Sequence, residues 1–172
     1  HPQRELIQAG AELIGSDSVA AAIEVLSVAI EALETAGVTA ITVDLTLPDL
    51  VETLSRDVLP LAATHLEAVR AVLDAKDAGG LAALGAEGYQ PFIAAAGPIA
   101  PSLAKLRALG IDALATRLDA IEAIAAALGD RVTLTLDPTE RHGFEYQSWI
   151  GFSLFGAGPS GESLSSEVGR GG

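Results

Sequence analysis

The chain contains two polar side chains, Gln8 and Glu12, that are spaced to contact the two ends of a small molecule. They lie in residues 4–14, where apolar and polar residues alternate as in a strand with one buried face. Two strand residues four positions apart share a face and are separated by about 13 Å. An amide and a carboxylate at that spacing can accept hydrogen bonds from a ligand that carries an ammonium or imidazolium group. We therefore expect Gln8 and Glu12 to line one small-molecule pocket.

Polar side chains also recur at alternate positions of residues 39–47 and 132–137. Together with the first segment, they predict a polar sheet face formed by Gln8, Glu12, Thr42, Asp44, Thr46, Thr133, Thr135 and Asp137. A solvated sheet face has the same polarity, so the threonines alone do not identify a site. The carboxylates and Gln8 are more informative, because a concave acidic floor suits a cationic ligand.

Two sequence periods alternate along the chain and predict the elements that carry these residues. A period of two predicts strands at residues 4–14, 39–47 and 132–137. Aromatic and β-branched residues predict a fourth strand at residues 144–155, and we expect a short fifth strand near Glu167. A period of three to four between Ser18 and Gly37 predicts an amphipathic helix over residues 18–36. Residues 48–129 are rich in Ala and Leu at helical spacing and predict five or six short helices, the last near residues 112–128.

These elements predict an α+β fold, in which helices cover one face of an antiparallel β-sheet. We expect residues 1–47 and 130–172 to form the sheet domain, and residues 48–129 to form an inserted α-helical lobe. The chain begins without methionine and ends in a glycine-rich segment, so we expect it to be the interior of a longer protein.

The composition argues against several classes of partner and chemistry. Lys and Arg number 10 against 23 Asp and Glu, and the resulting net charge of −13 repels nucleic-acid phosphates. No apolar run approaches the roughly 20 residues that span a bilayer, so we expect no membrane insertion. The chain has 0 cysteines, which excludes disulfides and thiol catalysis. No signal-peptide pattern follows His1, and we expect a cytoplasmic protein.

Other candidate sites have simpler explanations. Residues 156–161 match a dinucleotide-binding glycine pattern, but they enter a serine-rich loop with no predicted helix to hold a phosphate. The three histidines, at positions 1, 65 and 142, lack metal-ligand spacing. Glu140 and Glu145 are two nearby carboxylates, as in an acid/base pair. We expect them not to act together, because a turn residue and a strand residue face different neighbours. We expect no metal and no cofactor.

A longer segment, residues 137–155 (DPTERHGFEYQSWIGFSLF), resembles a signature of the histidyl-tRNA synthetase family. The synthetases carry arginine where this chain has His142, and that arginine stabilises charge while the amino acid is activated. Histidine is shorter than arginine and is ordinarily neutral near pH 7, so it is a poor substitute. The resemblance thus implies a fold without catalytic residues. Alternatively, His142 only caps a turn and packs locally.

A second segment, residues 4–15 (RELIQAGAELIG), resembles the end of motif 2 of class II aminoacyl-tRNA synthetases in its histidine-specific form. The resemblance implies that Gln8 and Glu12 line a histidine pocket. It also carries His142, Tyr146 and Gln147 into that pocket, with Gln147 in place of a second tyrosine. The sheet would then be of the class II synthetase type, and the helical lobe would stand where this family inserts a helical domain.

Five short motifs, QAGAE, TLPDL, DPTER, GFEY and GFSLF, resemble the synthetase-like regulatory subunits of ATP phosphoribosyltransferase. That resemblance implies a noncatalytic subunit that activates the short-form catalytic subunit, within a hetero-octamer, and mediates feedback by histidine on histidine biosynthesis. Two alternatives remain open. The chain could be an active histidyl-tRNA synthetase core that binds ATP and histidine, or a helical interaction module in which the motifs are inert.

Overall fold

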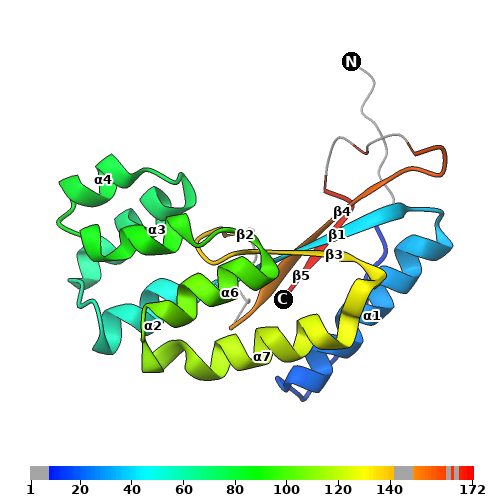
Figure 1. Ribbon diagram of the computed structural model, residues 1–172, viewed down its shortest axis with the longest axis horizontal. Helices are drawn as coiled ribbons and strands as arrows, with labels where there is room; N and C mark the ends of the chain where they lie inside the picture. The colour runs from blue at the N-terminus through cyan, green and yellow to red at the C-terminus, as the bar shows by residue number, and fades with distance from the viewer. Residues whose placement is uncertain (1–7, 142–148, 162–163, 165–166) are drawn as a thin grey trace.

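The computed structural model describes residues 8–141, 149–161, 164 and 167–172, which form an α+β fold (Figure 1). The described sheet has the strand order β2-β3-β1-β4-β5. Its strands are β1 (Thr39–Thr46), β2 (Gly97–Pro98), β3 (Thr133–Asp137), β4 (Gly151–Ala157) and β5 (Gly169–Gly171). The helices are α1 (Val19–Thr35), α2 (Leu50–Asp57), α3 (Leu66–Asp74), α4 (Ala78–Ala83), α5 (Gln90–Ala94), α6 (Ile99–Ala108) and α7 (Asp112–Leu128). Short 3-10 turns, η1 (Ala63–His65), η2 (Glu87–Tyr89) and η3 (Gly129–Arg131), connect them.

Helix α1 begins and ends where the sequence predicts. The Ser18 hydroxyl accepts a hydrogen bond from Ala21 N at 3.2 Å, which satisfies a free N–H group of the first turn. Gly37 follows the helix at φ 86°, a left-handed conformation that glycine adopts without steric cost. Leu26 and Ile30 are fully buried, so this face of α1 is the one that packs on the sheet and α7.

Strand β1 lies at the centre of the sheet. It pairs with β4 in antiparallel orientation but with β3 in parallel orientation. The outer pairs, β2 with β3 and β4 with β5, are antiparallel. The sheet is therefore mixed, and the prediction of a wholly antiparallel sheet is wrong for the central pair. A parallel pair requires a long crossover connection, and the helices between β1 and β3 supply it.

The described part of the first predicted strand, residues 8–14, has no regular secondary structure and is exposed. The prediction of a strand over residues 4–14 is therefore wrong for this part. An alternating sequence forms a strand only where a neighbouring strand satisfies its backbone groups. The described registers pair β1–β5 with one another, and residues 8–14 take part in none of them. Ile14 is consequently 88 % exposed.

Residues 50–128 contain the six helices α2–α7, which agrees with the predicted five or six. In Figure 1, α6 and α7 run along the same side of the sheet as α1, whereas α3 and α4 lie beyond one end of it. The separation of this segment into an inserted lobe stays a prediction. Within the described residues, no helix combines the length and the apolar character that crossing a bilayer requires.

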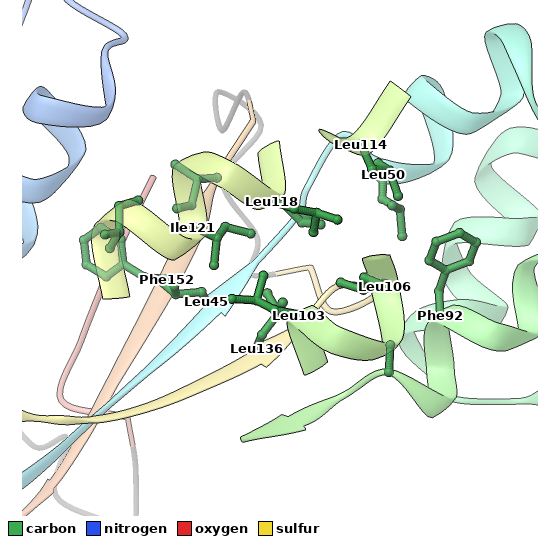
Figure 2. Close-up of a cluster of buried hydrophobic side chains, with 14 of the residues drawn as sticks. Leu45, Leu50, Phe92, Leu103, Leu106, Leu114, Leu118, Ile121, Leu136 and Phe152 are labelled. Atoms are coloured by element: carbon green, nitrogen blue, oxygen red, sulfur yellow. The ribbon is translucent and has the colours of Figure 1, made fainter. Parts of the chain in front are cut away.

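The core lies between the sheet and the helices that cover it (Figure 2). Leu45 of β1, Leu136 of β3 and Phe152 of β4 project from one face of the sheet. Leu118 and Ile121 of α7 meet them from the opposite side. These side chains are at most 5 % exposed. Because alternate strand residues point to opposite faces, the residues between them form a second face with a different chemistry.

Ionisation of the buried Tyr89 hydroxyl should lower the free energy of unfolding at alkaline pH. The Tyr89 ring is 1 % exposed, its hydroxyl donates to the Leu59 carbonyl at 2.8 Å, and burial raises its pKa to about 12. The raised pKa belongs to the folded state, so the stabilisation is complete below the ordinary pKa near 10 and is lost as the pH rises through about 12. Between about pH 9 and 12, the free energy of unfolding measured with urea should fall by about 2 kcal/mol more in the wild type than in Tyr89→Phe. Equal pH slopes for the two proteins would contradict this assignment.

Candidate functional site

The candidate site is the sheet face opposite the core. Strand register aligns one residue from each of four neighbouring strands on this face, because cross-strand partners point to the same side. These residues, which we call the polar row, are Thr135 of β3, Asp44 of β1, Ser153 of β4 and Arg170 of β5. Every member can donate or accept a hydrogen bond, in contrast to the leucines and phenylalanine on the other face.

Hydrogen bonds fix the side chains of the polar row. The Thr135 hydroxyl donates to the Asp44 carboxylate. The Ser153 hydroxyl, which is fully buried, donates to Glu167 Oε2 at 2.6 Å. Arg170 donates to the other oxygen of the same Glu167 carboxylate. Two carboxylates against one guanidinium leave this group with a net negative charge. The arrangement is therefore suited to a cationic group such as an ammonium.

The rows on either side of the polar row extend its chemistry. Thr46 pairs in register with Asp137 and Gly151, is fully buried, and its hydroxyl has no hydrogen-bond partner in the described structure. Such a buried hydroxyl is costly unless a further group bonds to it. On the other side, Thr42 and Phe155 border a shallow depression of about 390 Å³. The remaining lining residues of the depression are Ala40, Gly156, Ala157, Gly161 and Leu164.

Of the residues that the sequence assigns to a histidine pocket, the structure describes two. Gln8 and Glu12 lie in the exposed segment before α1, outside the sheet. The structure therefore does not place Gln8 and Glu12 on the sheet face beside Asp44 and Thr135. The other three, His142, Tyr146 and Gln147, lie outside the described residues. The structure does bring together the other members of the predicted polar sheet face, because β1 and β3 pair in register. Thr42, Asp44 and Thr46 lie beside Thr133, Thr135 and Asp137.

Sequence reasoning missed three residues of this face, Ser153, Glu167 and Arg170. A signal for Ser153 was present, because it is a lone polar residue between Phe152 and Leu154 in an otherwise apolar strand. A short strand near Glu167 is predicted, but the three residues of β5 are too few to show which side chains share a face. Only the register of β4 with β5 brings Arg170 beside Ser153.

Comparisons with known proteins give the chain a family. A family model for histidyl-tRNA synthetase matches residues 1–172. The chain is 40% identical over 178 residues to the ATP phosphoribosyltransferase regulatory subunit of Paramagnetospirillum magneticum, and 37% identical over 178 residues to that of Rhodospirillum centenum. Each alignment covers 99% of this chain and 45% of the relative. The chain thus spans less than half the length of these relatives.

Solved structures share the fold. An ATP phosphoribosyltransferase regulatory subunit/histidyl-tRNA synthetase from Bacillus halodurans superposes with a TM-score of 0.73 at 20% identity, covering 93% of this chain and 44% of that one. A chain of the ATP phosphoribosyl transferase (HisG:HisZ) complex from Thermotoga maritima gives a TM-score of 0.69 at 16% identity, covering 91% of this chain and 56% of that one. These similarities confirm the predicted class II synthetase type of fold. The chain belongs to the histidyl-tRNA synthetase family.

Proposed function

We propose that this chain is part of a noncatalytic regulatory subunit of ATP phosphoribosyltransferase. The observation that carries the proposal is the identity of 37–40% over 99% of the chain to proteins of that name. The partner is the short-form catalytic subunit, and the two form a cytoplasmic hetero-octamer. Histidine, the end product of histidine biosynthesis, is the effector. The fold shared with a chain of the HisG:HisZ complex supports the choice of partner.

The proposed histidine pocket combines the polar sheet face with the residues that the family resemblance assigns. Asp44 and Glu167 supply fixed negative charge on the sheet for the ammonium of histidine. Gln8, Glu12, His142, Tyr146 and Gln147 supply the contacts that distinguish its imidazole. Gln8 and Glu12 are exposed and lie outside the sheet, so the proposal requires their side chains to reach the ligand from a segment that is not part of the sheet.

The residue at position 142 separates binding from catalysis in this proposal. Activation of an amino acid by ATP develops negative charge on the phosphates, and an arginine stabilises it through a bidentate pair. His142 has no such fork, and near neutral pH an unperturbed imidazole carries little positive charge. Loss of the arginine leaves the binding of histidine unimpaired and removes the electrostatic stabilisation of the transition state.

Mixing the full-length protein with a short-form catalytic subunit tests the proposal. Size-exclusion chromatography with light scattering should show one large complex, and phosphoribosyl transfer by the catalytic subunit should rise when the complex forms. Histidine should then inhibit the complex. Separate elution of the two proteins, with no gain in transferase activity, would refute the proposal.

One alternative function has an observation in its favour, because the family model that matches the whole chain is named for the synthetase itself. An active synthetase core binds ATP and histidine and exchanges pyrophosphate into ATP when histidine is present. The full-length protein should show no histidine-dependent pyrophosphate exchange if it is a regulatory subunit. Exchange at rates typical of a synthetase would establish the alternative.

A further inference from the structure

The C-terminal end of α3 and the turn that follows it contact the first residues of the signature segment, residues 137–155. Lys76 Nζ donates to Asp137 Oδ1 at 2.8 Å and to the Thr139 hydroxyl at 2.7 Å. Asp137 ends β3, and its carboxylate also accepts the Thr139 backbone N–H at 3.0 Å. One lysine side chain thus holds the strand end and the turn that follows it.

A second contact from the same helix lies four residues after Asp137. The Asp74 carboxylate accepts the backbone N–H of Arg141 at 3.0 Å. The Arg141 side chain pairs with Glu67 of α3 at 3.3 Å. Residues 137–141 are therefore attached to α3 at both ends, and residue 142 is the next in the chain.

The backbone at Lys76 shows that the position is unusual for a lysine. Its φ is 55°, in the left-handed region, where it ends α3 with hydrogen bonds from Lys76 N to Leu73 O and from Asp77 N to Val72 O, both 2.9 Å. Glycine is the usual residue at this place after a helix, because a side chain there clashes with the neighbouring backbone. A lysine at this position destabilises the turn, but its amine contacts both Asp137 and Thr139.

We propose that Asp74 and Lys76 are positioning residues, which hold residues 137–141 and thereby couple histidine binding at the signature to the helical segment. This inference rests on the proposed function, because it takes histidine as the ligand. The coupling is reciprocal: a helical segment held in place favours histidine binding, and bound histidine favours the same arrangement of α3. The helical segment is then the part of the chain through which the effector's presence reaches other surfaces.

The test uses two substitutions of Lys76 in the full-length protein. Lys76→Gly removes the amine and relieves the left-handed backbone, so thermal stability should stay the same or rise. Lys76→Met removes the amine and keeps the backbone requirement. In both variants the amides of Thr139 and Arg141 should exchange hydrogen faster, and the Kd for histidine, measured by calorimetry, should rise about 5- to 10-fold.

The matched control is Lys105→Met, which removes an equal charge and a 2.7 Å hydrogen bond to the Ala94 carbonyl, far in sequence from the signature. It should leave the Kd for histidine and both amide exchange rates at wild-type values. Unchanged exchange in the Lys76 variants, or faster exchange with an unchanged Kd, would overturn the inference. If the wild type itself does not bind histidine, the proposed function fails on that measurement, and the coupling inference fails with it. The exchange rates of Thr139 and Arg141 then still decide whether Lys76 positions residues 137–141.

Discussion

Replacing Glu12 by glutamine should weaken histidine binding by roughly 3- to 10-fold in the full-length protein. Glutamine keeps the size of the side chain and its ability to accept a hydrogen bond, but it loses the negative charge. A charge-assisted hydrogen bond to an ammonium or imidazolium is about twice as strong as a neutral one, and the lost difference accounts for this range. Calorimetric titration with histidine measures the change directly, and the histidine concentration that half-inhibits the assembled complex should rise in parallel.

The control for this substitution is Glu31→Gln. Glu31 is an exposed carboxylate on α1, so the substitution makes the same change in charge on a helix surface. It should leave the Kd for histidine unchanged. If Glu12→Gln also binds histidine with wild-type affinity, then Glu12 makes no contact with the ligand, and the pocket must be formed by the sheet face without it.

Replacing Leu45 by alanine should lower the free energy of unfolding by about 3 kcal/mol. Leu45 is fully buried at the centre of β1, between the sheet and α7 (Figure 2). Truncation removes three carbons from the core cluster and leaves a cavity that the strand cannot close, because hydrogen bonds hold β1 on both edges. Urea denaturation of the wild type and the variant, followed by circular dichroism, gives the difference.

Leu109→Ala is the matched comparison for Leu45→Ala. Leu109 follows α6 and is 36% exposed, so its truncation leaves little cavity and should cost less than about 1 kcal/mol. Similar losses for the two variants would mean that the β1–α7 contact is not the centre of the core.

Much of the fold was predictable because its elements have local signals. Ser18 and Gly37 mark the ends of α1, and Gly129 at φ 55° ends α7 at the predicted residue. Strand β1 shows the regular alternation of a sheet with one buried face. These signals act over a few residues, and they predict an element without reference to its neighbours.

The errors in the fold concern partners that are distant in sequence. Alternation in residues 8–14 is the same signal as in β1, but no described strand lies beside them. The orientation of β1 relative to β3 depends on the path of the intervening helices, and that path has no local sequence signal. The pairing of Gly97–Pro98 with β3 was missed for a related reason, since two residues are too few to show a period.

The candidate site divides in the same way. The threonines and aspartates of β1 and β3 were predictable, because each strand shows which of its residues share a face. Ser153, Glu167 and Arg170 could be assigned to the site only from the structure, because their place on this sheet face depends on the pairing registers of β4 and β5. For the pocket residues His142, Tyr146 and Gln147, the family resemblance remains the basis of the prediction.

The central position of β1 has a consequence for synthesis of the protein. Asp44 and its partner Thr135 are 91 residues apart in sequence, and Ser153 follows later still. At typical rates of translation, β1 leaves the ribosome roughly 5 to 20 s before either neighbouring strand. Helices between them form within microseconds of emerging, whereas both edges of β1 stay unpaired for the whole interval. The surface that carries the polar row is thus completed last, and we expect aggregation through β1 to be the first failure of a nascent chain whose core is weakened.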